Sequence, residues 1–172
     1  LNAARFRQSG IDAEVNYSFP IFAGDVGIRG LVTYVDRQET QQFANVPVID
    51  SVNRAPFGVP RWRAAVVTGY SDDNWTITAF TRYRAAVSNE YDPRLAFDLP
   101  KINDSIYVDA SISRKVRGLG GELEVYLSAQ NLFDAGAPIL YPPPGAPGFF
   151  YPAVPGDDII GRRLNAGFRA RF

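Results

Sequence analysis

Three kinds of residue are missing from this chain of 172 residues: it contains no cysteine, no histidine and no methionine. Without cysteine there is neither a disulfide nor a thiolate nucleophile. Without histidine the chain lacks Ser-His and Cys-His nucleophile pairs, His-based zinc sites and the usual general base near neutral pH. Walker loops, dinucleotide fingerprints and metal-ligand clusters are missing too. We therefore expect a protein that is not an enzyme and that holds no metal or cofactor.

Long hydrophobic runs and an excess of one charge are also missing. No apolar run approaches the roughly 20 residues of a transmembrane helix, whereas a transmembrane β-strand needs only about 9 to 11 alternating residues. The 18 basic residues balance the 18 acidic ones, so nothing indicates a nucleic-acid partner. The chain begins Leu1-Asn2, with no initiator methionine and no signal peptide, and is expected to be a fragment or a processed product.

Alternation of apolar and polar residues dominates what is present. In residues 61–71, for example, Trp62, Val66 and Tyr70 fall on one set of positions and Arg61 and Arg63 on the other. A period of two places the two sets on opposite faces of a strand. The register within 25–39 is the least certain. Seven strands are predicted, over residues 4–19, 25–39, 61–71, 75–84, 105–117, 122–132 and 161–172.

The links between these segments are short and long in turn. Short links lie near 20–24, 72–74 and 118–121, and long links cover about 40–60, 88–104 and 134–158. This regularity is typical of an outer-membrane barrel with short periplasmic turns and long extracellular loops, and a soluble sandwich does not need it. Aromatic residues at both ends of an apolar face suit the two membrane interfaces, although aromatics favour strands in any sheet.

Two stretches near the end carry a resemblance. Gln130-Asn131-Leu132-Phe133-Asp134, followed by a long loop and by an alternating segment that ends at Phe172, resembles the end of a TonB-dependent outer-membrane receptor. Tyr107-Val108-Asp109-Ala110-Ser111 is similar to the antepenultimate strand of that family. The sequence departs from the family pattern after Asp134, where a tyrosine is common but Ala135-Gly136-Ala137-Pro138 stands, and the first tyrosine is Tyr141.

The resemblance implies an all-β fold: an antiparallel, up-and-down transmembrane β-barrel of 22 strands around a plug. Residues 1–172 would form about seven C-terminal strands, with the plug and the earlier strands missing. The family takes up scarce ligands such as ferric siderophores, cobalamin or oligosaccharides with energy delivered by the TonB complex. Its members lie in the bacterial outer membrane, in contact with lipid and lipopolysaccharide, with the C-terminus in the periplasm. Alternatives are a passive porin or, in another class, a soluble all-β ligand-binding module.

Three groups of residues are candidates for function. The resemblance implies that the last strand is a signal for the barrel-assembly machinery, through Leu164, Phe168 and Phe172. The aromatic, proline-rich segment around 141–152 is expected to be extracellular and either to contact a ligand or to cap the barrel; its candidates are Tyr141, Phe149, Phe150 and Tyr151. The charged residues opposite the apolar face are expected to face the lumen, where they pair with one another, with the plug or with an anionic substrate. These residues are Arg63, Arg82, Arg84, Asp109, Glu122, Glu124, Arg163 and Arg169.

Overall fold

The computed structural model describes residues 5–55, 58–88, 101–118, 120–138, 154 and 156–171. Seven long strands form the sheet that the alternation predicts, which confirms an all-β, antiparallel fold. Among the described residues, no helix is long and apolar enough to cross a membrane. The long strands are β1 (Arg5–Ile21), β2 (Gly24–Gln41), β4 (Trp62–Ser71), β5 (Trp75–Arg84), β8 (Ser105–Gly118), β9 (Gly121–Gln130) and β10 (Arg163–Arg171).

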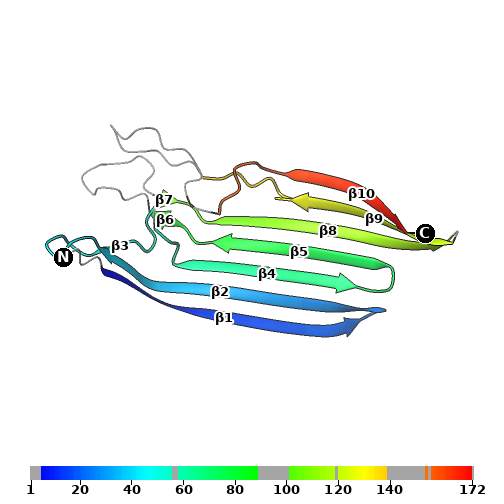
Figure 1. The fold of residues 1–172 in the computed structure, drawn as a ribbon, viewed down its shortest axis with the longest axis horizontal. Helices are drawn as coiled ribbons and strands as arrows, with labels where there is room; N and C mark the ends of the chain where they lie inside the picture. Colours follow the sequence, from blue (N-terminus) through cyan, green and yellow to red (C-terminus); the bar gives the residue numbers. More distant parts are fainter. Residues whose placement is uncertain are drawn as a thin grey trace.

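Each long strand is hydrogen-bonded to the next long strand in the chain, in the order β1-β2-β4-β5-β8-β9-β10. The β1–β2, β4–β5 and β8–β9 turns lie together at one end of the sheet, and the three long links lie at the other (Figure 1). We call these the turn end and the loop end. β10 finishes at the turn end, as the alternation of link lengths requires.

The register brings every predicted apolar set onto one face, because directly paired residues in adjacent strands point to the same side of a sheet. We call this side the apolar face and the other side the polar face. One apolar row crosses all seven strands through Tyr17, Ile28, Thr68, Ala79, Ala110, Ala129 and Leu164. One polar row crosses them through Ser18, Gly27, Gly69, Thr78, Ser111, Ser128 and Asn165.

The register shows which face each residue of the predicted strand 25–39 occupies, and it places a bulge in that strand. Gly10 pairs with Val35, but Ser9 pairs with Arg37, so Asp36 lies opposite no residue of β1 in the register. One extra residue in β2 exchanges the faces of the positions that follow it. The even positions from Val26 to Tyr34 therefore lie on the apolar face, and the alternation breaks only beyond them.

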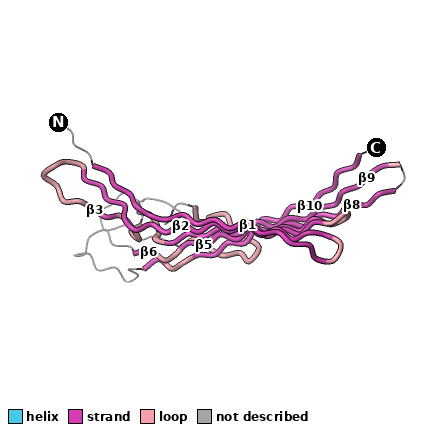
Figure 2. The backbone as a smooth tube through the Cα atoms, turned by 90° about the horizontal axis from the view of Figure 1, so that it is seen from below, coloured by secondary structure: helices cyan, strands magenta, loops and turns pink. Residues whose placement is uncertain are grey.

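The sheet is a single curved layer, and the described residues do not close it into a barrel (Figure 2). β1 and β10 are its two edges. Most of the apolar face is open: Ile11, Val15, Leu127 and Leu164 are each exposed by at least half.

A small core lies at the loop end rather than on the sheet. Ala55, Val87, Ile102 and Val154 form its buried cluster. The predicted long loops also contain three strands of two residues each, which alternation could not reveal because two residues show no period. These are β3 (Ile49–Asp50), β6 (Val87–Ser88) and β7 (Lys101–Ile102).

Candidate functional site on the polar face

All eight charged residues that were expected to face a lumen lie on the polar face, but in two groups. Arg63, Arg82, Arg84, Asp109 and Arg163 lie toward the loop end. The other three lie near the turn end, where Arg169 Nη1 is 3.4 Å from Glu124 Oε2 across the β9–β10 pair. Three members of the first group, Arg63, Arg82 and Arg84, line a cavity.

A buried ion pair forms the centre of that group. Arg84 in β5 holds Asp157 with two hydrogen bonds, from Nε to Oδ1 at 2.9 Å and from Nη2 to Oδ2 at 2.8 Å. The side chains of Arg84 and Asp157 are only 8% and 2% exposed. Ser105 Oγ donates a further bond to Asp157 Oδ1, and Arg84 Nη1 donates to the carbonyls of Ala85 and Asn103. Every side-chain polar atom of this pair therefore has a hydrogen bond, and the bonds to Asp157 anchor the segment before β10 to the polar face.

Two other arginines beside this pair, Arg82 and Arg63, have fewer hydrogen-bond and ion-pair partners. Arg82 Nη2 is 3.4 Å from Asp109 Oδ2, while the other carboxylate oxygen of Asp109 accepts a bond from the backbone N–H of Asn131. The Arg82 guanidinium carbon also lies 5.7 Å from the centre of the Phe80 ring and 5.5 Å from the centre of the Tyr107 ring. Arg63 lies in β4 directly opposite Arg84, and within the described part of the chain its side chain has no hydrogen bond or ion pair.

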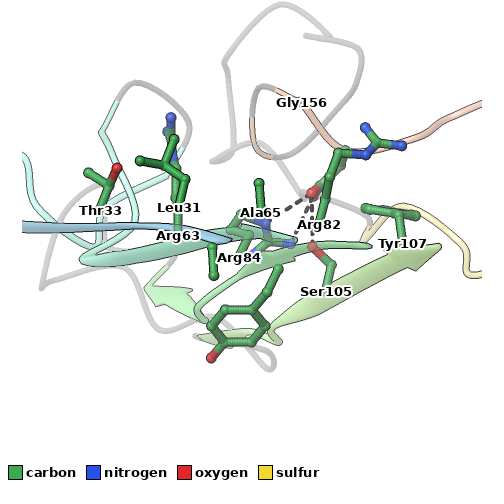
Figure 3. Close-up of a pocket in the computed structure, with 12 residues that line it drawn as sticks. Leu31, Thr33, Arg63, Ala65, Arg82, Arg84, Ser105, Tyr107 and Gly156 are labelled. Atoms are coloured by element: carbon green, nitrogen blue, oxygen red, sulfur yellow. Dashed lines mark hydrogen bonds and ion pairs between the residues drawn. The ribbon is translucent and has the colours of Figure 1, made fainter. Parts of the chain in front are cut away.

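These side chains surround a cavity of about 320 Å³. Figure 3 shows Arg63 and Arg82 on opposite sides of Arg84, and the register places all three arginines on the polar face. Leu31 and Ala65 give the cavity an apolar part, and hydroxyl groups complete the lining. The hydroxyl residues are Thr33, Tyr83, Ser105 and Tyr107.

The Asn-Leu-Phe-Asp element fixes the approach to β10. Asn131, fully buried with φ at 49°, donates from Nδ2 to the carbonyl of Ala135 and accepts the Ala135 N–H at Oδ1, both at 2.9 Å. Asp134 Oδ1 then accepts the backbone N–H of Arg162 at 2.8 Å. The element therefore ends β9 and holds the start of β10, which gives a structural reason for asparagine and aspartate at these two positions.

Asp158 supports the same segment from its other side. Its Oδ1 accepts the backbone N–H groups of Ile160 and Gly161, and its Oδ2 lies 3.6 Å from Arg163 Nη2. These hydrogen bonds, with that from Ile160 the strongest influence, hold the pKa of the Asp158 carboxyl below its usual value, while partial burial opposes them. Asp158 is therefore a charged anchor for the turn into β10.

The remaining candidates divide into exposed and undescribed residues. Leu164 and Phe168 project from the apolar face of β10 and are 65% and 75% exposed. Their role in barrel assembly stays a prediction. The aromatic loop residues Tyr141, Phe149, Phe150 and Tyr151 and the last residue, Phe172, lie outside the described residues.

Sequence reasoning missed Asp157, Ser105, Tyr107 and Thr33 as parts of the site. By sequence, Asp157-Asp158 is only a weak calcium candidate, together with Asp72-Asp73, and the described residues contain no group of three or more acidic side chains that could hold a metal ion. Asp157 lies 73 residues from its partner Arg84 along the chain, so no local pattern connects the two. The signal in the sequence that could have indicated Asp157 is an acidic residue in the link that leads back to the sheet, whose polar face is rich in arginine.

No protein-family profile, curated protein or solved structure matches this chain.

Proposed function

We propose that the chain is the C-terminal part of the β-barrel of a TonB-dependent outer-membrane transporter, which imports a scarce ligand such as a ferric siderophore, cobalamin or an oligosaccharide. The chain supplies wall and loops and performs no reaction. Its partners are outer-membrane lipid and lipopolysaccharide, the rest of the barrel with its plug, the TonB complex and the barrel-assembly machinery. The proposal rests on the sheet's two unlike faces and on the residues that resemble the family.

The uncovered apolar face is the observation that carries the proposal. Soluble proteins rarely expose a contiguous apolar patch of more than a few hundred Å². Here one face of seven strands presents aliphatic and aromatic side chains, and its members include Ile77, Ile112, Leu127 and Phe168, all exposed. Acyl chains suit such a face, and the opposite face, with its arginines and carboxylates, suits an aqueous lumen.

Aromatic positions agree with this orientation. On the apolar face Trp62 and Tyr34 are in contact near the loop end, with ring centroids 4.7 Å apart and ring planes tilted by 48°, and Tyr70 and Trp75 lie near the turn end. Trp62 and Tyr70 are separated along β4 by about 27 Å at the usual rise per residue. Tilted strands shorten this distance to roughly 20 Å along the membrane normal, close to the apolar band of about 25 Å in outer-membrane barrels.

One charged residue on the apolar face also fits. Arg114 pairs with Trp75 in the register, and its guanidinium lies 5.0 Å from the centre of the Trp75 ring. This pair lies beyond Tyr70 toward the turn end, where an arginine reaches the lipid headgroups with its charge and covers an aromatic ring with its stem. The apolar rows between the two aromatic levels carry no charge.

Two measurements on the full-length protein test the proposal. The first is fractionation of cell envelopes: the protein must remain in the membrane through buffer and high-salt washes and come out only with detergent. Extraction by buffer alone would establish a soluble module instead. The second is conductance in a planar bilayer, where a plugged transporter keeps the bilayer sealed and a porin opens a steady channel. Uptake of the candidate cargoes must then disappear in cells that lack TonB.

A further inference from the structure

We infer that the cavity between Arg63 and Arg82 binds the anionic group of the imported ligand, a carboxylate or a phosphate, with Arg63 as the principal contact. The inference rests on the proposed function, because it requires the polar face to border the aqueous path of a ligand. It adds to that function the chemical class of the cargo and the residues that select it.

The first argument is an imbalance of charge. The register places Arg63 directly opposite Arg84 and diagonal to Arg82, so three guanidinium groups share one patch of the sheet. Like charges at such positions repel each other. Among the described residues, Asp157 is the only carboxylate that lines the cavity, and Arg84 and Ser105 already use both of its oxygens. The charge of Arg63 is therefore uncompensated within this part of the chain.

The second argument is a buried hydrogen-bond donor that has no acceptor. Arg82 Nε is buried and has no hydrogen-bond partner in the part of the chain that the structure describes. The contact between Arg82 and Asp109 is long, at 3.4 Å. Buried polar groups nearly always find partners, and a group without one is often explained by an ion or a water. Arg82 therefore offers the cavity a buried N–H donor that an anion would satisfy.

The third argument is shape. Side chains at diagonal positions on adjacent strands have β-carbons about 7 to 8 Å apart, which lets two long arginines converge on one oxyanion. The cavity of about 320 Å³ is far larger than one carboxylate group, and Leu31 and Ala65 give it an apolar part. The ligand is therefore an organic molecule whose anionic group lies between the arginines and whose body lies over that apolar part.

Titration calorimetry on the full-length protein tests the inference with three probes: citrate, inorganic phosphate and the neutral sugar maltotriose. Wild-type protein must bind citrate or phosphate and bind maltotriose more weakly. Arg63→Gln must weaken binding of the anion about tenfold or more, as expected for the loss of a charge-assisted hydrogen bond. Arg63→Lys keeps the charge without the planar guanidinium, so its affinity for the anion must lie between those of the wild type and Arg63→Gln. Binding of citrate but not phosphate assigns the anionic group as a carboxylate, and binding of phosphate but not citrate assigns it as a phosphate.

Arg169→Gln is the matched control, because it removes an arginine from the same face, near the turn end, where Glu124 is its partner. It must leave anion binding unchanged. An equal loss in both variants, unchanged binding in Arg63→Gln, or no anion binding by the wild type overturns the inference. Binding needs neither TonB nor a membrane potential. Its failure in a protein that passes the conductance and uptake tests therefore removes this site and leaves the transporter proposal intact.

Discussion

Burial separates the ion pairs of the polar face into two kinds. The Arg84–Asp157 pair is almost closed to solvent and has two short hydrogen bonds, whereas Arg169 in the Arg169–Glu124 pair is 63% exposed. Exposed pairs stabilise a fold little, because water and salt screen them and long side chains lose entropy. A buried pair behaves differently, since removing one partner leaves the other charge in a poor solvent.

Asp157→Ala is therefore expected to destabilise the protein by about 3 to 5 kcal/mol, because it leaves the Arg84 guanidinium buried without a counter-charge. The segment before β10 should also become open to proteases, since Asp157 anchors it. Urea unfolding of the full-length protein in lipid vesicles and limited proteolysis measure the two effects. Glu124→Ala is the control, and its expected loss is about 0 to 1 kcal/mol. Similar losses in the two variants would contradict the assigned role of burial.

A second residue effect concerns pH. Asp72 in the β4–β5 turn accepts the hydroxyl of Tyr70 at Oδ2 and the backbone N–H groups of Asn74 and Trp75 at Oδ1, each at 2.7 Å. These bonds, the one from Tyr70 foremost, lower the pKa of the Asp72 carboxyl from its usual value of 3.8. The folded protein therefore favours the ionised carboxylate more strongly than the unfolded chain does.

The consequence is a stabilisation that is complete above the usual value and disappears as the pH falls through the lower pKa of the folded state. We expect Asp72→Asn to lower the free energy of unfolding by a constant amount above pH 3.8 and by a shrinking amount below it. Unfolding curves across this range give the difference from wild type. Asp73→Asn, at the next position in the same turn, is the control and should show no such trend. A gap for Asp72→Asn that persists in strong acid would count against the mechanism.

At the scale of whole strands, two neighbouring valines of β4 lie on opposite faces of the sheet and are expected to contact different surroundings. Val66 lies on the apolar face midway between Trp62 and Tyr70, and Val67 lies on the polar face. The same substitution at the two positions therefore compares lipid with lumen at nearly constant depth. Arginine near the middle of the bilayer destabilises an outer-membrane barrel by about 2 to 4 kcal/mol.

Val66→Arg should accordingly make folding into lipid vesicles less favourable by about 2 to 4 kcal/mol, and Val67→Arg should change the free energy of folding by less than about 1 kcal/mol. Equilibrium folding of the full-length variants, followed by gel mobility with and without heating, provides the measurement. If Val67→Arg proves the more harmful of the two, the assignment of the faces is inverted. Equal effects would mean that neither face contacts lipid.

The strands also show how far the sequence predicts this fold. Strict alternation predicted the faces of β4 and β5 and placed Arg63, Arg82 and Arg84 together on one of them. It succeeded because a period of two leaves no other choice of face once one face is apolar. It was ambiguous in β2, where the apolar residues Leu31 and Val35 lie on the polar face, and it ended β9 too late because Asn131 turns the chain through a positive φ.

The site itself was only half predictable. For an arginine within a strand, its position in the alternation predicts which face of the sheet it lies on. Asp157 comes from an irregular link, and its contact with Arg84 depends on how that link folds back over the sheet. Ser105 and Tyr107 alternate as ordinary strand residues and gain a role only from what the link places over them. Contacts of this kind follow from packing and not from any local pattern.

At the scale of the molecule, the open sheet poses a problem of closure. Within the described residues, β1 and β10 each have one edge that pairs with no other strand, and such edges invite pairing. Lipid can satisfy the apolar face but cannot satisfy the backbone groups of those edges, since no water in the bilayer core can bond to them. The proposal therefore requires further strands between the two edges, so that the polar face becomes the inner wall of a closed barrel.

A closed barrel also makes the two ends of the sheet face different compartments. We expect the loop end to lie outside the cell and the turn end to lie in the periplasm, as in barrels with long external loops. Because the chain contains no cysteine, single cysteines report each end without background. Asn45→Cys places one in the exposed β2–β3 link, and Asp73→Cys places one in the β4–β5 turn.

A maleimide attached to a polymer too large to pass a porin should label Asn45→Cys in the full-length protein on intact cells. It should label Asp73→Cys only after the outer membrane has been permeabilised. Lysed cells are the control, in which both cysteines must react to the same extent. Labelling of Asp73→Cys alone on intact cells would reverse the orientation and place the arginine cavity nearer the periplasm. Labelling of both on intact cells would remove the membrane barrier between the two ends, and with it the transporter proposal.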